Sequence, residues 1–164
     1  MIILLKNKQT LQIDEFKFKC CVGKNGISSK KKEGDKTTPK GLFKLGNLYY
    51  RSDRLTKPNT KLKVEKIKKS MGWCDDLNKP KFYNKLIRSN NEIKHEKLYR
   101  SDHKYDLFIL IKYNYPKPII PLGSCIFLHL TTNYKPTAGC IALKKSDFLI
   151  LVKLIKPNTK ILIS

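Results

Sequence analysis

Apolar residues along the chain occur mostly in short runs that alternate with polar residues or stand between turns. Phe16 and Phe18 alternate with lysines, which is the period of a half-buried strand, and this run leads to Gly23. Residues 107–113 are strongly apolar and β-prone. The other expected strands are residues 1–5, 9–13, 41–50 and 125–130.

One helix is expected near the C-terminus. Residues 148–155 form an apolar stretch that Pro157 stops, and Ser146 is a suitable N-cap before them. Residues 23–41 are expected to be a loop and residues 70–100 to be irregular, because both are polar. The pattern therefore predicts one mostly-β domain, residues 1–164, with one or two short helices.

The chain is strongly basic, with 35 Lys and Arg residues against 13 Asp and Glu residues. Such a charge attracts nucleic acids, anionic lipids or an acidic cell-wall polymer. Only four of the basic residues are Arg, and the lysines are spread along the whole chain. Because base-reading and phosphate-binding sites favour Arg, the lysines are interpreted as a solvated surface, and no nucleic-acid partner is expected. No apolar stretch approaches the ~20 residues of a membrane-spanning helix.

The five cysteines do not show the pattern of a disulfide framework or a metal site. Their number is odd, and no CxxC or CxxH spacing is present. Most of them are expected to be small buried hydrophobes, and no metal is expected. The N-terminal residues lack the charged segment, apolar core and cleavage site of a secretory signal, so no export address is visible.

The segment with the clearest chemical content is residues 127–143. A strand ends on His129, a polar loop follows, and the loop closes on Gly139 and Cys140 before a second apolar run. A hairpin-like return is expected to bring the imidazole to the thiol, whose free pKa of ~8.5 requires a base for nucleophilic attack. Backbone N–H groups around Gly139 could hold an oxyanion. The alternative is a buried cysteine and a hydrogen-bonded histidine without catalysis.

These residues resemble the active-site signature of a known family. His129 followed by Thr137-Ala138-Gly139-Cys140-Ile141 is similar to the His and Ser/Thr-x-Gly-Cys elements of the L,D-transpeptidase (YkuD-like) catalytic domain, in its compact single-domain branch. Upstream, residues 23–26 resemble the family's glycine-rich approach, and residues 38–43 its T-P-x-G-x-F element. Three further blocks extend the likeness over most of the chain: residues 49–54, 72–76 and 101–106.

The chain departs from the family pattern at three positions. Leu130 follows His129 where most members have Gly, and Thr137 replaces the commoner Ser. Ala142 stands where many members carry an Arg that orders the pocket or holds a substrate carboxylate. The resemblance therefore predicts the nucleophile better than it predicts substrate recognition.

The resemblance implies an L,D-transpeptidase-type β-sandwich with a catalytic cleft beside Cys140. It implies acyl transfer on peptidoglycan stem peptides, in which Cys140 attacks the carbonyl before a terminal D-alanine and His129 acts as general base and then acid. The backbone at Thr137, Ala138 and Gly139 would support the oxyanion. Carbapenem-type β-lactams would acylate the same sulfur, and no metal or organic cofactor is needed.

Four other residues are candidate substrate contacts. His103 lies just before the expected strand 107–113, and Trp73 could line the cleft. Arg51 and Arg54 could hold a stem carboxylate in place of the missing Arg. The alternatives are a hydrogen bond within a turn for His103 and core packing for Trp73.

Three functions remain open at this point. The resemblance favours an L,D-transpeptidase that cross-links or remodels the cell wall. An L,D-carboxypeptidase would use the same residues with water as acceptor. A non-catalytic basic module that binds an anionic polymer would not need the thiol. The implied substrate points to the cell envelope, and the chain is expected to be a monomer.

Overall fold

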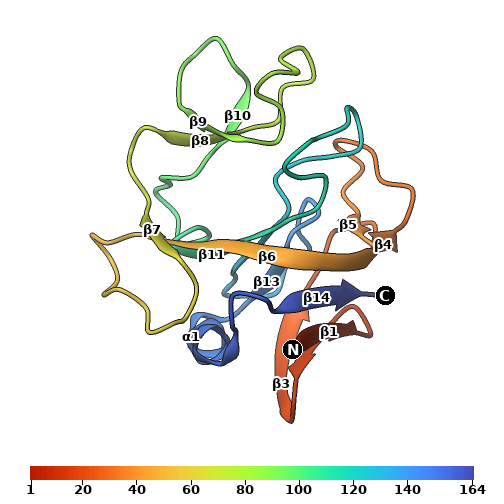
Figure 1. Cartoon of the computed structure of the whole chain (residues 1–164), viewed down its shortest axis with the longest axis vertical. Coiled ribbons are helices and arrows are strands. Elements are labelled where there is room, and N and C mark those ends of the chain that lie inside the picture. Colours follow the sequence, from red (N-terminus) through yellow and green to blue (C-terminus); the bar gives the residue numbers. More distant parts are fainter.

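The computed structural model describes all 164 residues, and its regular secondary structure is mainly strands, with one helix (Figure 1). The largest sheet contains nine strands in the order β11-β12-β13-β3-β2-β1-β14-β6-β7. These strands are β1 (Ile2–Lys6), β2 (Thr10–Ile13), β3 (Phe16–Cys21), β6 (Gly41–Tyr50), β7 (Val64–Lys66), β11 (Leu107–Ile111), β12 (Phe127–Leu130), β13 (Ile141–Leu143) and β14 (Lys160–Ile163). The expectation of a mostly-β fold is confirmed.

The nine-stranded sheet closes on itself because β11 pairs with β6 as well as with β12. Eight strands form a ring, and β7 adds to the outside of β6. Closure removes the unpaired strand edges that an open sheet would expose. The sheet is therefore barrel-like, and the expected sandwich of two stacked sheets is not confirmed.

Aliphatic side chains fill the interior of the barrel. The period-two alternation of β1 and β2 turns Ile3, Leu5, Leu11 and Ile13 inward, and each is at most 1% exposed. All five residues of β11 are buried, because one face of this strand meets the barrel interior and the other meets a second cluster outside it.

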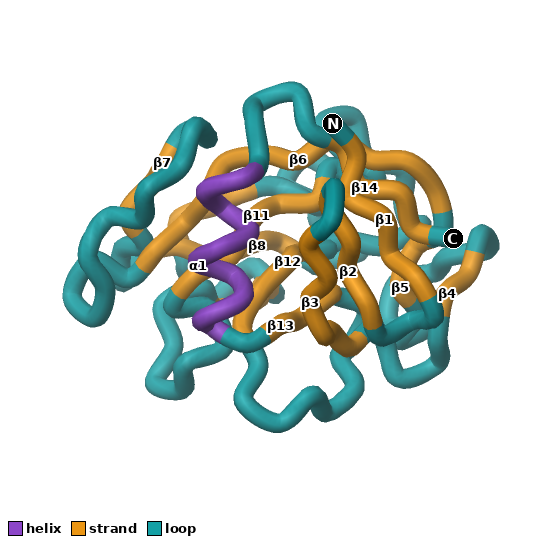
Figure 2. The backbone as a smooth tube through the Cα atoms, turned by 90° about the horizontal axis from the view of Figure 1, so that it is seen from below, coloured by secondary structure: helices purple, strands orange, loops and turns teal.

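Helix α1 (Lys145–Leu154) packs beside β12, and its apolar face joins the cluster that fills the barrel interior (Figure 2). It buries Phe148, Leu151 and Val152. The expected N-cap is wrong: Lys144 occupies that position without a side-chain cap bond, and Ser146 lies in the first turn. Burial of the apolar face stabilises this helix more than capping does. With ten residues it is too short to cross a bilayer, and the structure has no other helix.

Part of the region expected to be irregular forms a second sheet. β8 (Met71–Cys74) lies between β9 (Leu86–Arg88) and β10 (His95–Lys97), at the top of Figure 1. These strands have only three or four residues, which is too short for an alternation of apolar and polar positions to mark them in the sequence. The expected loop 23–41 also contains two short paired strands, β4 (Ile27–Ser28) and β5 (Thr38–Pro39).

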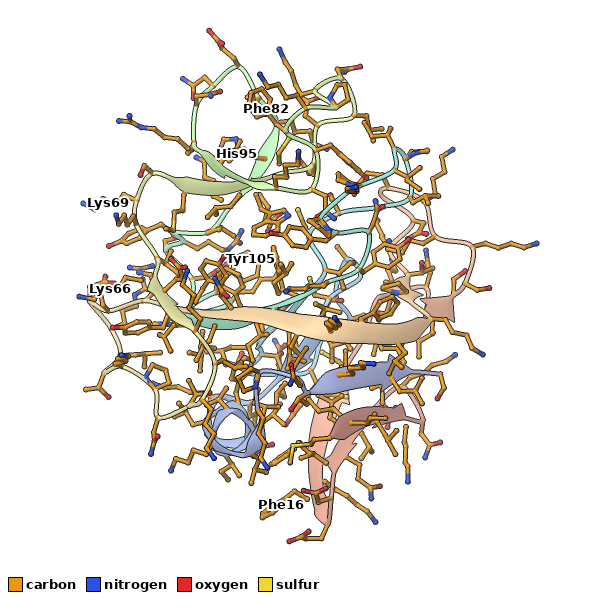
Figure 3. All side chains as sticks on the ribbon, viewed as in Figure 1. Phe16, Lys66, Lys69, Phe82, His95 and Tyr105 are labelled. Atoms are coloured by element: carbon orange, nitrogen blue, oxygen red, sulfur yellow. The ribbon has the colours of Figure 1, made fainter.

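A second core, mainly aromatic, lies between the barrel and the three-stranded sheet. Trp73, Tyr105, Phe108 and Phe127 belong to it, and the rings of Phe108 and Phe127 lie 4.9 Å apart. Tyr105 occupies the space between the two sheets (Figure 3). Cys140 is a member of this outer core and not of the barrel interior.

Candidate active site

The path from β12 to β13 places Cys140 and His129 on one face of the sheet. The two strands run parallel, with His129 opposite Ala142. Because side chains alternate along a strand, His129 and Ala142 share the outer face with Phe127 and Cys140, one pleat earlier. The expected hairpin-like return is wrong, since the loop of residues 131–140 carries the chain back to the start of β12 instead of reversing its direction.

Cys140 ends the loop just before β13, with 7% of its surface exposed. Its thiol donates a hydrogen bond to the carbonyl of Cys125 at 3.1 Å, and its Sγ accepts one from the Phe127 N–H at 3.4 Å. Burial raises the pKa of the Cys140 thiol to about 11, although the positive charge of Lys104 acts in the opposite direction. The thiol is therefore protonated at neutral pH.

The His129 imidazole is held in one tautomer. Its Nδ1 lies 2.9 Å from the carbonyl oxygen of Leu130, and because a carbonyl only accepts, Nδ1 carries the proton. Its Nε2 is buried and has no hydrogen-bond partner. The Tyr105 ring packs edge-on against the imidazole at 5.4 Å. Burial, followed by the charge of Lys104, lowers the pKa of His129 to about 3, so the imidazole is neutral at pH 7.

No hydrogen bond joins the two side chains in the structure. The Cys140 thiol is directed to Cys125, while the lone pair of His129 Nε2 is unused. Both groups are uncharged at neutral pH, because burial disfavours the thiolate and the imidazolium alike. The site therefore holds a neutral thiol and a neutral imidazole on one sheet face, not an ion pair.

Thr137 braces the turn that presents the thiol. Its hydroxyl donates to the Cys140 carbonyl at 2.6 Å and accepts from the Gly139 N–H at 3.1 Å. The Gly139 N–H is therefore occupied, whereas the N–H groups of Ala138 and Cys140 donate no hydrogen bond in the structure. These two backbone donors are therefore unpaired on either side of Gly139.

Buried hydrogen bonds from Thr38 hold the same turn in place. The hydroxyl of Thr38, which is fully buried, accepts from the Gly23 N–H and donates to the Gly139 carbonyl, both at 2.9 Å. Gly139 has φ 141°, and a Cβ at this position would lie 2.8 Å from the Thr37 carbonyl oxygen. Glycine is required there because the backbone just before the T-P-x-G-x-F element passes so closely.

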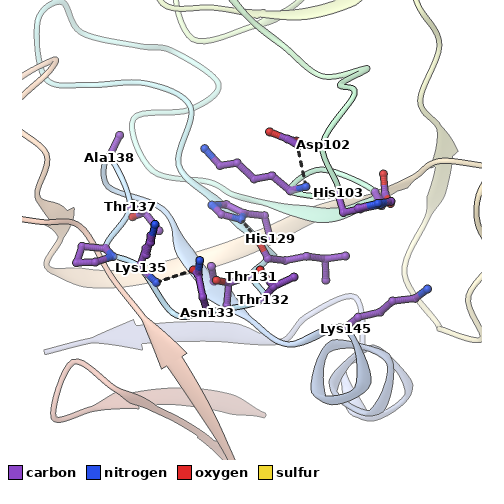
Figure 4. Close-up of a pocket in the computed structure, with 15 residues that line it drawn as sticks. Asp102, His103, His129, Thr131, Thr132, Asn133, Lys135, Thr137, Ala138 and Lys145 are labelled. Carbon is purple, nitrogen blue, oxygen red and sulfur yellow. Dashed lines mark hydrogen bonds and ion pairs between the residues drawn. The ribbon is translucent and has the colours of Figure 1, made fainter.

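A pocket of about 670 Å³ opens beside the imidazole (Figure 4). Two chain segments line it, residues 102–106 except Tyr105 and residues 129–138 except Tyr134, together with Ala142 and Lys145. His129, Thr137 and Ala138 are part of its wall, but Cys140 lies next to this wall without lining it. The structure contains no group of three or more His, Cys, Asp and Glu side chains placed to hold a metal ion.

The two arginines considered as carboxylate ligands are engaged within the protein. Arg51 is 3% exposed and binds Asp53 through two hydrogen bonds. Arg54 donates to Asp106 at 2.7 Å and to the carbonyls of Ser101 and Asp102. Neither lines the pocket. The structure does not bring them to the site.

His103 and Trp73 differ in their relation to the pocket. His103 lines it and hydrogen-bonds Asp106 at 2.6 Å within the turn. Trp73 is 1% exposed, donates to Asn84 at 2.9 Å and packs in the aromatic core. His103 is therefore part of the pocket wall, whereas Trp73 packs against Phe127 in the aromatic core and does not line the pocket.

Three residues near the site are not singled out by the sequence analysis: Thr38, Lys104 and Tyr105. Each lies inside a block that carries the family resemblance, the T-P-x-G-x-F element or residues 101–106. The resemblance marks these blocks as important. It does not say which side chain of a block contacts the catalytic loop, because that depends on the contacts between distant segments.

The comparisons with known proteins identify the family of the chain. The model of the YkuD family, the L,D-transpeptidase catalytic domain, matches residues 1–163. Searches of curated proteins and of solved structures found no match. The family match spans nearly the whole chain and implies L,D-transpeptidase-type cross-linking of peptidoglycan at the level of the family. This chain belongs to the L,D-transpeptidase catalytic domain (YkuD) family.

Proposed function

We propose that this protein is a cysteine acyltransferase of peptidoglycan stem peptides, with Cys140 as nucleophile and His129 as proton carrier. The observation that carries the proposal is the unpaired Nε2 of His129. A buried polar atom without a partner costs about 1–3 kcal/mol, so folded proteins keep few of them. An unprotonated Nε2 on the same sheet face as a thiol is what general base catalysis needs.

The first half-reaction forms a thioester. The Cys140 sulfur attacks the carbonyl carbon between the L-centre of a diamino acid and a terminal D-alanine, while the thiol proton moves to Nε2 of His129. The carbonyl electrons move to oxygen, where the unpaired N–H groups of Ala138 and Cys140 stabilise the charge. The C–N bond then breaks, and the leaving nitrogen takes the proton from Nε2.

The second half-reaction releases the acyl group. An amine of a neighbouring stem attacks the thioester carbonyl and gives its proton to Nε2 of His129. The C–S bond breaks, and the sulfur recovers that proton, so the enzyme returns to its starting state with a new amide bond. Water in place of the amine would give a carboxylate and the L,D-carboxypeptidase reaction.

The thiol has to leave its present hydrogen bond before it attacks. It donates to Cys125 at 3.1 Å, and Cys140 is buried and does not line the pocket. Breaking one such bond costs about 0.5–1.5 kcal/mol, which substrate contacts in the pocket can offset. We therefore propose that bound substrate draws the Cys140 sulfur toward His129.

A carbapenem tests the nucleophile directly. Incubation with a carbapenem followed by peptide mass mapping is expected to show one adduct, on Cys140. Cys21 is the matched control because it is also buried, with 8% of its surface exposed against 7% for Cys140. Cys21→Ala should keep the adduct, and Cys140→Ala should lose it. Folded protein with an unmodified Cys140 would contradict the proposal.

A stem-peptide assay tests the reaction. Donor and acceptor peptides are incubated with the protein, and the products are separated by mass. A cross-linked product that disappears in Cys140→Ala supports transpeptidation, whereas a shortened donor alone supports the carboxypeptidase. A basic binding module would bind anionic polymer equally well before and after this substitution and would form neither product.

A further inference from the structure

The leaving group of the proposed reaction carries a charge close to His129. The nitrogen that leaves takes its proton from Nε2 of the imidazole. In a terminal amino acid, a single carbon atom separates this nitrogen from a free carboxylate. The carboxylate must therefore lie in the pocket next to His129 when the bond breaks. An internal peptide bond has no such carboxylate, because the next residue is joined there.

Lys104 is placed to meet this carboxylate. Its carbonyl accepts a hydrogen bond from the Leu130 N–H at 3.1 Å, which ties it to the strand end beside His129. Its ammonium group lies 5.0 Å from the centre of the Tyr105 ring, and that ring packs against the imidazole at 5.4 Å. Lys104 and His129 line the same pocket.

No carboxylate of the protein neutralises Lys104. The two acidic residues of the pocket are bound elsewhere: Asp102 pairs with Arg100 and Asp106 with Arg54, each at 2.7 Å. The field of Lys104 reaches both reacting groups. After burial, it is the next cause that lowers the pKa of His129, and for Cys140 it opposes the effect of burial. An unpaired cation at the wall of a pocket favours an anionic ligand.

Resting on the proposed acyl transfer, we propose that Lys104 binds the free α-carboxylate of the leaving amino acid and thereby selects the last peptide bond of a stem. The position opposite His129 on the neighbouring strand is Ala142, whose short side chain leaves the pocket open to this carboxylate. Lys135, on the other lining segment, adds a second positive charge to the same pocket.

Lys145 provides a matched control. It borders the same pocket at the start of α1, but its side chain points away from His129 (Figure 4). Lys145→Met and Lys104→Met each remove one positive charge from the same pocket, but only Lys104 lies close to His129. A general effect of net charge on an acidic substrate would therefore appear in both variants.

The test compares two donor peptides that differ in one group. Both end in D-alanine, one with a free carboxylate and one with a carboxamide, and kcat/KM is measured for each. Lys104→Met is expected to lower kcat/KM about 10- to 100-fold for the carboxylate donor and less than about twofold for the carboxamide, since a hydrogen bond to a charged group is lost only with the former. Lys104→Arg should retain most of the preference, and Lys145→Met should not change it.

The outcomes separate this subsite from the proposed function. If Lys104→Met slows both donors equally, it acts on the thiol or the fold, and the subsite proposal is wrong. The same holds if the wild-type protein turns over both donors at the same rate. If the wild-type protein turns over neither donor, the proposed acyl transfer itself fails, and the subsite fails with it.

Discussion

The two faces of the β12–β13 pair carry opposite kinds of residues. The inner face contributes Leu128, Leu130, Ile141 and Leu143 to the barrel interior. The outer face carries Phe127, His129, Cys140 and Ala142, next to the aromatic core and the pocket. One short parallel pair of strands therefore belongs to both the packed core and the candidate active site.

The inner face of the β12–β13 pair contributes to the stability of the fold, whereas the outer face carries the groups of the proposed reaction. On the inner face, side chains need only volume and shape, so their contribution follows the apolar surface they bury. On the outer face, the imidazole and the thiol keep polar atoms that the protein satisfies with backbone groups or leaves unpaired. Substitutions on the two faces should therefore change different measurements.

The largest expected effect separates Cys140 from its neighbour Ile141. Cys140→Ser should lower carbapenem acylation at least ~1000-fold, since the nucleophile is lost. Its free energy of unfolding should stay within about 1 kcal/mol, because a hydroxyl can use the same partners at Cys125 and Phe127. Ile141→Ala should cost about 2–5 kcal/mol, measured by urea unfolding. Equal losses of stability in the two variants would remove the distinction between the faces.

A smaller effect is expected at Thr38, which holds the Gly139 carbonyl from behind. Thr38→Val should slow carbapenem acylation about 10- to 100-fold, because the Gly139–Cys140 peptide loses its orientation. Thr38→Ser should restore most of the rate, since it keeps the hydroxyl. Alkylation by iodoacetamide, which needs no oxyanion donor, serves as control, and an equal slowing of both reactions would assign Thr38 to the fold alone.

The smallest effect concerns the pH dependence of stability at His129. Its folded pKa of about 3 lies below the ordinary histidine pKa of 6.5. The unfolded chain therefore binds a proton first as the pH falls below 6.5, and stability is lost on acidification. Between pH 7 and pH 5 this amounts to about 2 kcal/mol. Urea unfolding at the two pH values should show this loss in the wild type and not in His129→Gln.

The loss of stability between pH 7 and pH 5 is distinct from the loss caused by protonation of Asp35, which occurs at lower pH. Burial alone would raise the pKa of Asp35, but hydrogen bonds from Lys31 and nearby backbone hold it at about 2. The stability that this carboxylate contributes is therefore lost only as the pH falls below the ordinary aspartate pKa of 3.8. If His129→Gln keeps the full loss between pH 7 and pH 5, the imidazole is not the group that titrates. His129 would then not be the neutral base that the buried outer face implies.

The sequence by itself determined the strands whose apolar positions alternate or run continuously. β1, β2, β3, β6, β11 and β12 lie where their patterns predict, since each has enough apolar residues to mark a buried face. The sheet of β8, β9 and β10 has no such mark, because its burial comes from a few residues such as Trp73. The family resemblance also located the blocks around Thr38 and Lys104 without stating what their side chains contact.

Only the tertiary structure decided how these parts meet. Closure of the barrel, the parallel return from β12 to β13 and the hydrogen bond from Thr38 to Gly139 all join residues far apart in the chain. Arg51 and Arg54 are occupied by internal carboxylates, while Lys104 keeps a free charge, which no sequence pattern distinguishes. Local sequence sets which face of a strand is apolar, but burial, the pKa values and the free partners of a polar group depend on what the rest of the chain places against it.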